Sequence, residues 1–251
     1  NTTKRIQIND KEFNRVIGGG LVKGSVILIG GEPGIGKSTL TLKIALSLEE
    51  TILYVAGEES SEQIKMRANR LNISNENCFI YNETHVSSIL KSSDKINPTL
   101  IVIDSIQTLY VDSIDAAPGS ISQIRHSTEQ LIRYSKNKSI PIIIIGHITK
   151  DGSIAGPKIL EHMVDTVLQF EGDNKNLYRI LRVKKNRFGS TAEIGIYEML
   201  NDGLRQVDNP SELLISNNKN SLSGNAIAAT IEGVRPIMID CLLYTSPSPR
   251  D

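Results

Sequence analysis

One segment of this 251-residue sequence restricts the possible folds more than any other: residues 31–38, Gly-Glu-Pro-Gly-Ile-Gly-Lys-Ser. It matches the pattern G-x-x-x-x-G-K-[S/T] at every fixed position. The run Val26–Gly30 before it has the all-apolar, β-branched composition of a buried parallel strand, and Lys37–Leu48 after it carries apolar residues at helical spacing. We therefore predict a glycine-rich turn between a buried strand and a helix.

A turn of this kind has the chemistry of an anion site. Its glycines let backbone N–H groups point to a common centre, and the helix that follows adds the positive end of its dipole. Lys37 is expected to contact the β- and γ-phosphates of a nucleotide, and Ser38 to ligate Mg²⁺. The alternative, a glycine-rich turn that binds nothing, is disfavoured by the complete motif. The predicted nucleotide-binding residues are Gly31, Glu32, Pro33, Gly34, Ile35, Gly36, Lys37, Ser38 and Thr39.

Carboxylates follow two other apolar strands. Asp104 closes the run that begins at Leu100, and we expect it to support the Mg²⁺ ion, although a strand-end aspartate can also cap a turn. The run Thr51–Ala56 is followed by a pair of acids. We assign Glu58 to the activation of the water that attacks the γ-phosphate, and Glu59 to the next helix or to a supporting role.

The order of elements predicts the fold class. Strands and helices alternate up to about residue 146, and three strands then follow without helices between them: Val164–Phe170, Leu177–Val183 and Glu193–Met199. This order indicates an α/β fold with a mostly parallel sheet that antiparallel strands extend. Asp173-Asn174 is predicted to form a hairpin turn between two of these strands.

Composition excludes several classes of function. Lys plus Arg and Asp plus Glu both total 28, so nucleic-acid binding would require a local basic patch. Cys78 and Cys241 form no CxxC pair, so we expect no zinc site in this chain. Two unclustered thiols fit the reducing cytoplasm, and the longest apolar run, near residues 140–145, is far shorter than the roughly 20 residues of a membrane span.

The chain divides into four parts by composition. Residues 1–210 are predicted to form the core, and the Ser/Asn-rich stretch 211–223 indicates a linker. Strand-like apolar content resumes over residues 224–240, and residues 241–251 show no periodicity, which indicates a non-native or disordered tail. Because the first residue is Asn1 and not methionine, we expect a fragment or a processed product.

Several motifs occur in the order seen in the bacterial RadA (Sms) family of RecA-like ATPases, and the chain resembles that family over about residues 8–240. Besides the P-loop, they are Phe13–Gly20, Gly57–Ser60, Asp104–Gln107, Ala117–Ser120, Gly146–Lys150 and Lys185–Gly189. The segment Lys185–Gly189 is the most specific to the family, since the other motifs recur among RecA-like ATPases. The resemblance implies a RecA-like P-loop ATPase core with ATP and Mg²⁺ as cofactors.

The resemblance also implies a biological role. Members of this family are ATP-dependent motors in homologous recombination and DNA repair, which assemble as hexameric rings and drive branch migration. For this chain it implies single-stranded and branched DNA, further copies of itself and a recombinase as partners. The family begins with a four-cysteine zinc finger, which this sequence lacks, and ends with a domain like the Lon protease, which residues 224–240 would open.

Particular residues acquire roles from the resemblance alone. Lys185 would extend to the γ-phosphate of a neighbouring subunit, and Arg187 is the second candidate; without the family, an ordinary solvated basic strand end is the simpler interpretation. His147 would sense the γ-phosphate, although a lone histidine is often merely hydrogen-bonded. Loops 111–119 and 148–158 would contact DNA, and the candidate contacts there are Lys150, Lys158 and Arg125.

Two other functions remain open on the sequence. A RecA/KaiC-like regulatory ATPase could act through protein partners without DNA, and it would share the acidic pair and the glycine-rich segment near the N-terminus. The Lys185–Gly189 segment argues against it. A P-loop small-molecule kinase is the least favoured, because it would not account for the paired acids together with the consecutive strands near residue 200.

Overall fold

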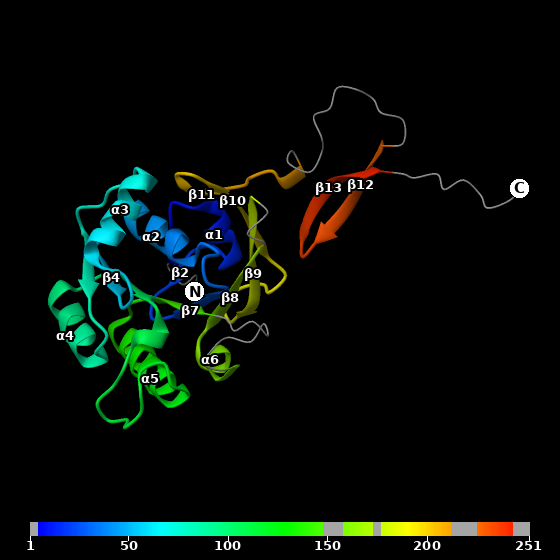
Figure 1. Ribbon diagram of the computed structural model, residues 1–251. Coiled ribbons are helices and arrows are strands. Elements are labelled where there is room, and N and C mark those ends of the chain that lie inside the picture. The colour runs from blue at the N-terminus through cyan, green and yellow to red at the C-terminus, as the bar shows by residue number, and fades with distance from the viewer. Residues whose placement is uncertain (1–4, 148–157, 173–176, 212–224, 243–251) are drawn as a thin grey trace, which may run out of the picture.

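A single large sheet organises the structure, a computed structural model that describes residues 5–147, 158–172, 177–211 and 225–242 (Figure 1). Its strands are β3 (Val26–Gly31), β4 (Ile52–Ala56), β5 (Cys78–Asn82), β6 (Leu100–Asp104), β7 (Ile142–His147), β8 (Thr166–Glu171), β9 (Tyr178–Asn186), β10 (Ile194–Leu200) and β11 (Gly203–Gln206). Their order is β11-β10-β9-β8-β3-β7-β6-β4-β5. The strands from β8 to β5 pair in parallel, whereas β9, β10 and β11 join in antiparallel register, which confirms the predicted α/β fold.

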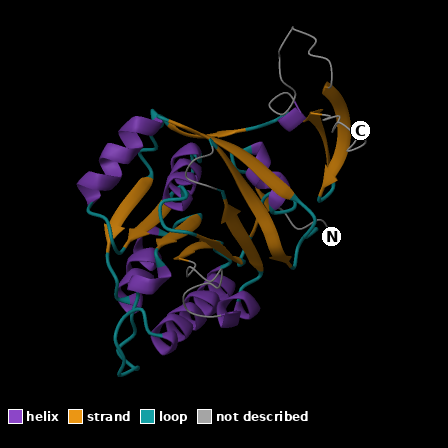
Figure 2. Cartoon of the chain, turned by 45° about the vertical axis from the view of Figure 1, so that its right-hand side comes forward, coloured by secondary structure: helices purple, strands orange, loops and turns teal. Residues whose placement is uncertain are grey.

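Helices cover both faces of this sheet (Figure 2). One face packs on α2 (Lys37–Ser47) and α3 (Ser61–Leu71), and the other on α4 (Val86–Ile96), α5 (Ile121–Lys138) and α6 (Lys158–Met163). Along β3, Ile27 and Ile29 belong to the first core, and Val26 and Leu28 to the second. Because both sides of each central strand are buried, these strands are uniformly apolar and do not alternate with polar residues.

Local hydrogen bonds determine where α3 starts. The Ser60 hydroxyl accepts a bond from the Gln63 backbone N–H (3.3 Å), and the Gln63 side chain accepts one from the Ser60 N–H (2.8 Å). This capping box satisfies donors at the first turn that have no partner within the helix. Asn72 then ends the helix in the left-handed conformation, with φ of 51°. The box fixes α3 directly after the acidic pair.

Several short elements differ from the sequence-based expectation. The periodicity predicted neither β1 (Arg5–Ile6), α1 (Lys11–Val16), β2 (Leu21–Val22), α6 nor β11. These elements have at most six residues each, so contacts with the rest of the fold stabilise them more than their own pattern does. The helix α4 runs from Val86 to Ile96, and polar residues occupy its exposed positions. The hairpin turn expected at 173–174 lies outside the described residues.

A separate hairpin contains β12 (Asn225–Glu232) and β13 (Arg235–Leu242), which pair in antiparallel register (Figure 1). Ile237 of this hairpin packs against Ile194 and Ile196 of β10. The strand β13 extends past residue 240, where we expected the ordered segment to end. Most of the expected linker, and the rest of the expected tail, lie outside the described residues.

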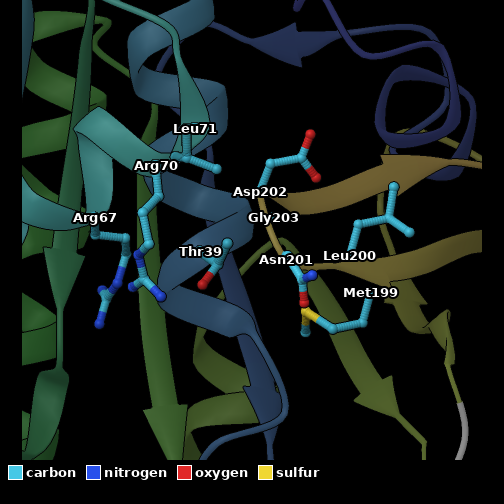
Figure 3. Close-up of a pocket in the computed structure, with 9 residues that line it drawn as sticks. All are labelled: Thr39, Arg67, Arg70, Leu71, Met199, Leu200, Asn201, Asp202 and Gly203. Carbon is cyan, nitrogen blue, oxygen red and sulfur yellow. The ribbon is translucent and has the colours of Figure 1, made fainter.

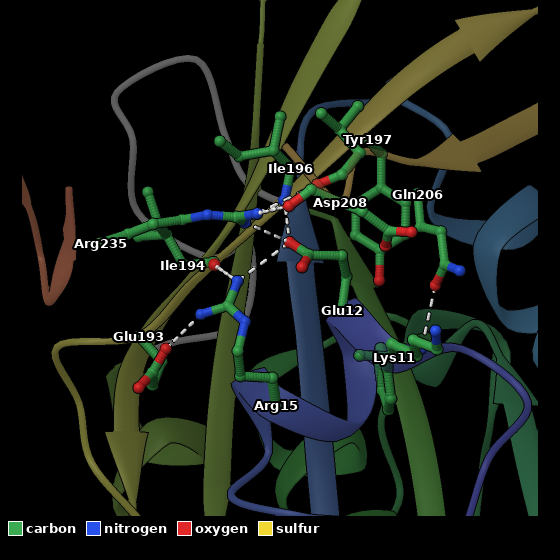
Figure 4. Close-up of polar contacts among 12 residues, drawn as sticks. Lys11, Glu12, Arg15, Glu193, Ile194, Ile196, Tyr197, Gln206, Asp208 and Arg235 are labelled. Atoms are coloured by element: carbon green, nitrogen blue, oxygen red, sulfur yellow. Dashed lines mark hydrogen bonds and ion pairs between the residues drawn. The ribbon is translucent and has the colours of Figure 1, made fainter. Parts of the chain in front are cut away.

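Charged side chains hold the hairpin on the core (Figure 4). Arg235 Nη1 donates to Glu12 Oε2 at 2.7 Å, and its other nitrogen donates to the carbonyl oxygens of Val207 and Asp208. Arg15 contacts the same Glu12 carboxylate at 2.9 Å. Glu12 is only 4% exposed, so this buried carboxylate joins α1, β10 and the hairpin. None of the described helices combines the length and the apolarity that crossing a membrane requires.

Candidate functional site

The glycine-rich segment forms the turn that its sequence predicts, between β3 and α2. Gly34 has φ of 78° and Gly36 has φ of 113°, in the left-handed region that favours glycine. A Cβ atom at Gly36 would also lie 2.9 Å from the Met199 Cε atom, the movable end of a flexible side chain. It is therefore the backbone conformation that favours glycine at both positions.

The Lys37 ammonium group lies inside this turn. Its Nζ donates to the carbonyl oxygens of Gly31 (2.7 Å) and Glu32 (2.8 Å), and the residue is 4% exposed. Burial lowers the pKa of Lys37 to about 8, although the negative charges of Asp104, Glu58 and Glu32 oppose the shift. The two contacts are with neutral carbonyl groups. A phosphate beside the turn would give the ammonium a stronger, charge-assisted partner.

Asp104 and Ser38 meet beside the turn, as the sequence predicts. Asp104 ends β6, and Ser38 lies close enough to its carboxyl group to affect the pKa of that group. Tyr54 Oη donates to Asp104 Oδ2 at 2.8 Å. Burial raises the pKa of Asp104, while Ser38 and Tyr54 act against that shift. Sequence reasoning missed Tyr54, which lies within the apolar run of β4 and follows no motif.

These two residues fit a magnesium ion. Mg²⁺ favours hard oxygen ligands and commonly retains several waters, so one hydroxyl and one carboxylate suffice when phosphate oxygens complete the shell. Among the residues that the structure describes, no three His, Cys, Asp or Glu side chains converge as a self-sufficient metal site. Ser38 and Asp104 would therefore hold the ion together with a bound nucleotide, and not without it.

The two acidic residues after β4 have different surroundings. Glu58 Oε1 accepts a bond from the Ser105 hydroxyl at 2.7 Å and lies 3.4 Å from His147 Nε2, and its side chain is 51% exposed. Glu59 forms an ion pair with Arg67 of α3. The charge of Glu59 is thus compensated within the fold, whereas Glu58 faces the cleft. This geometry favours Glu58 for work on a bound water, as the sequence suggested.

The turn and the acidic residues border one cleft of about 370 Å³, within the range of small-molecule sites. Its lining residues are Pro33, Gly34, Gly36, Lys37, Ser38, Thr39, Glu58, Glu59, Arg67, Arg70 and His147. A second pocket, between α3 and the turn that joins β10 to β11, shares Thr39, Arg67 and Arg70 with it (Figure 3). The two arginines were not predicted; their spacing of three residues on α3 is the signal that could have indicated them.

Lys185 and Arg187 lie at the edge of the sheet opposite the P-loop, toward the amino ends of the parallel strands. Lys185 pairs in register with Val167 of β8, and Val167 pairs with Leu28, near the beginning of β3, whereas the P-loop follows the end of that strand. Lys185 Nζ donates to the backbone carbonyls of Glu161 (2.8 Å), His162 (3.1 Å) and Val164 (2.7 Å) at the end of α6. Arg187 Nη1 contacts Asp165 at 3.2 Å. The fold therefore does not bring either cation to its own P-loop.

The candidate DNA contacts are not gathered by the described residues. Lys150 lies outside them, and Lys158 begins α6. Arg125 forms an exposed ion pair with Glu129 at 3.0 Å. The loop 111–119 contains two aspartates and no lysine or arginine, and four hydrogen bonds with the buried Gln123 side chain fix its backbone. Phosphate contacts by this loop would require its backbone and not its side chains.

Known structures share this fold. A KaiC-like protein from Pyrococcus horikoshii superposes with a TM-score of 0.65 at 20% identity, over 82% of this chain and 99% of that protein. The RadB recombinase gives a TM-score of 0.62 at 20% identity, over 80% and 98% of the two chains. Residues 6–85 match the model of the KaiC ATPase family. Together with the P-loop, these similarities show that the chain has a RecA-like fold.

Proteins of similar sequence show which proteins with this fold the chain resembles most specifically. The DNA repair protein RadA of Bacillus subtilis is 50% identical over 247 residues, which are 97% of this chain and 54% of that protein. RadA of Streptococcus pneumoniae is 48% identical over 246 residues, 97% of this chain and 59% of that protein. The chain is thus similar in sequence to bacterial RadA, and it spans little more than half the length of these relatives.

Proposed function

We propose that this chain is the ATP-hydrolysing part of a DNA motor in recombination and repair, and that single-stranded DNA stimulates its turnover. The observation that carries the ATPase proposal is the convergence of Lys37, the Ser38–Asp104 pair and Glu58 on one cleft at the end of the parallel strands. In sheets of this type, ligands bind outside the carboxyl ends of the strands. The role in DNA repair is supported by the RadA relatives, which bear that description.

The geometry suits hydrolysis of the bond between the β- and γ-phosphates. Backbone N–H groups of the turn and the Lys37 ammonium would bind the phosphates and stabilise the charge that develops on them. Mg²⁺, held by Ser38 and Asp104, would neutralise the phosphate oxygens when bound. Glu58 would orient a water and accept its proton as the water oxygen attacks phosphorus, and ADP leaves as the bond to the β-phosphate oxygen breaks. His147 would respond to that step, and its contact with Glu58 supports this role.

The nucleoside would extend into the second pocket. Arg67 and Arg70 border both cavities, and the β10–β11 turn closes the far side around Gly203 (Figure 3). A planar guanidinium group can stack on a base or bind a phosphate oxygen, so both arginines suit this position. ATP would then lie along α3, with its phosphates at the turn and its base next to β11.

Lys185 would act on a nucleotide bound to a neighbouring copy in a hexameric ring. Its position at the opposite edge of the sheet supports this proposal, because it cannot serve the cleft of its own subunit while bonded to the end of α6. To reach another subunit it must exchange three carbonyl partners for phosphate oxygens. Arg187 remains the second candidate, with Asp165 as its present partner.

We also propose that residues 1–210 form the ATPase core and that the hairpin β12–β13 opens a further domain. The hairpin is a sheet of its own and pairs with no strand of the large sheet. Its outward residues Ile227, Ile231 and Met238 are between 46% and 72% exposed. An apolar sheet face of that kind is expected where more polypeptide packs.

Measurement of nucleotide binding and turnover in two variants tests the ATPase proposal. Lys37→Ala removes the ammonium from the turn, so we expect ATP affinity to fall on the order of 100-fold. Lys43→Ala is the matched control on the same helix, since Lys43 Nζ contacts the Leu204 carbonyl outside the cleft. Wild-type turnover in a folded Lys37→Ala protein would disprove the proposed site.

The DNA proposal has a separate test, because a regulatory ATPase that works through protein partners would share the cleft. The fold likeness to a KaiC-like protein is the observation that keeps that alternative in view. We expect ATP turnover to rise when single-stranded DNA is added at low salt, and the DNA affinity to fall steeply as salt increases. If the rate of ATP turnover at low salt is the same with and without DNA, while ATP still binds, the regulatory ATPase is favoured.

A further inference from the structure

The Tyr54 hydroxyl contacts a candidate metal ligand, and no motif or charge pattern in the sequence predicts this contact. Tyr54 lies in the middle of β4, is 1% exposed, and pairs in register with Val102 of β6. Asp104 lies two residues further along β6, and the Tyr54 hydroxyl reaches its Oδ2 atom at 2.8 Å. A buried hydroxyl requires a polar partner. Here the partner is the carboxylate that the proposed magnesium site uses.

The same hydroxyl also lies next to the P-loop helix. Thr41, which is fully buried on α2, is close enough to Tyr54 to oppose the rise that burial causes in the pKa of Tyr54, and its own hydroxyl donates to the Lys37 carbonyl at 3.1 Å. One turn earlier on α2, Ser38 is close enough to Asp104 to oppose the rise in the pKa of that carboxyl group. The Tyr54 hydroxyl thus lies between the first turns of α2 and the end of β6, where the two proposed magnesium ligands meet.

We propose that Tyr54 is a positioning residue for the magnesium ion of the nucleotide site. By holding Oδ2 of Asp104, it fixes the plane of the carboxylate and hence the direction of Oδ1. This inference rests on the proposed nucleotide site and adds a residue to it. Groups that orient a metal ligand in this way commonly change metal affinity 10–100-fold when they are removed.

A purely structural role makes a different prediction. The ring of Tyr54 belongs to the core between the sheet and α2, so its loss would affect folding in any case. Tyr54→Phe keeps the ring and removes only the hydroxyl. Tyr197→Phe is the matched control: Tyr197 is fully buried, and its hydroxyl donates to the carboxylate of Asp10, the N-cap of α1, at 3.1 Å. Both variants lose one buried tyrosine–aspartate bond, and only one of these bonds involves a proposed metal ligand.

The experiment is a Mg²⁺ titration of the binding of a fluorescent ATP analogue to the full chain, with a second measurement in EDTA. For Tyr54→Phe we expect the Mg²⁺ concentration at half-saturation to rise about tenfold, while the affinity without metal stays within about twofold of wild type. Tyr197→Phe should match wild type in both measurements. Equal Mg²⁺ dependence in folded Tyr54→Phe, Tyr197→Phe and wild-type proteins would overturn the inference.

Two further outcomes are distinguishable. If Tyr54→Phe does not fold, Thr41→Val removes a hydroxyl close to that of Tyr54 and should shift the Mg²⁺ dependence in the same direction by a smaller factor. A folded Thr41→Val protein with wild-type Mg²⁺ dependence would then overturn the inference. If the wild-type chain binds no nucleotide at all, the proposed function fails first.

Discussion

Cations have different surroundings at the two edges of the large sheet, which are formed by the carboxyl ends and by the amino ends of its parallel strands. At the carboxyl edge, Lys37 lies in a cleft with Asp104 and Glu58, and its ammonium contacts only two neutral carbonyls of its own turn. At the opposite edge, Lys185 occupies three carbonyl oxygens at the end of α6, and Arg187 contacts the buried carboxylate of Asp165. Both edges hold buried or half-buried positive charge, and the cleft of about 370 Å³ lies at the carboxyl edge.

The two edges also differ in the groups that lie near these cations. The carboxyl edge has the glycine-rich turn, the candidate metal ligands Ser38 and Asp104, and Glu58, and Arg67 and Arg70 also line its cleft. At the opposite edge, the side chains of Lys185 and Arg187 are bonded to the end of α6 and to Asp165. If copies of the chain associate through these edges, we expect Lys185 of one copy to approach the cleft of the next.

The largest effect should come from removing that cation. We expect Lys185→Ala to lower ATP turnover of the assembled protein on the order of 10³-fold, as loss of a finger-like cation does, and to leave ATP affinity near wild type. Lys184→Ala is the matched control, because the neighbouring lysine contacts Glu171 at the surface. Steady-state turnover and equilibrium binding of ATP, measured side by side, check both statements.

Mixed assemblies sharpen this prediction. Subunits with Lys185→Ala keep an intact cleft, and subunits with Glu58→Gln keep the cation, so a mixture should regain part of the turnover that both lack alone. Rings that form from both variants without any regained turnover would contradict a role between subunits. The lysine would then be no more than a cap for α6.

A smaller effect should follow from the pKa of Lys37, which burial lowers to about 8 in the free protein. A bound triphosphate favours the charged ammonium, so binding takes up a proton and ATP affinity should fall as pH rises through 8. Between pH 7 and pH 9 we expect a loss of about tenfold, since the protonated fraction falls by that factor. Calorimetry in buffers of different ionisation enthalpy measures both the affinity and the proton uptake.

Lys37 and Lys185 should contribute differently to the pH dependence of ATP affinity. Burial and the neighbouring Arg187 also lower the pKa of Lys185, but this group does not touch its own cleft. Lys185→Ala should therefore retain the full pH dependence of ATP affinity. An unchanged affinity between pH 7 and pH 9 in the wild-type chain would show that Lys37 does not bind phosphate as an ammonium.

The sequence was most informative where residues act through local chemistry. The turn 31–38 needs glycine at left-handed positions and a lysine at the start of α2, so one short pattern predicts both its shape and its ligand. Asp104 followed from a parallel strand whose end had to lie at the same edge. Glu58 was preferred over Glu59, and the different partners of the two side chains agree with that choice.

Contacts between distant segments could not be predicted. Tyr54 meets Asp104 because β4 and β6 are neighbours in a particular register, which no spacing in the sequence states. The carbonyls that hold Lys185 belong to the end of α6, a six-residue helix too short to show periodicity. Glu12 and Arg235 lie 223 positions apart and meet only because the hairpin folds back on α1. The sequence thus indicates the ligand of the site better than the residues that support it.

The smallest effect should follow from substitution of Arg235. This substitution tests whether a cation that is paired within its own chain serves stability. Like Lys185, Arg235 is satisfied within its own chain, with a side chain 14% exposed on a Glu12 carboxylate 6% exposed. If such pairs are structural, Arg235→Ala should cost about 2 kcal/mol of stability, because Glu12 keeps only Arg15 and one backbone N–H as partners. That corresponds to a melting temperature lower by roughly 4–8 °C, with unchanged ATP affinity. Arg125→Ala, which breaks an exposed pair with Glu129, should shift it by less than about 2 °C. Equal shifts in the two variants would mean that the buried pair does not secure the hairpin.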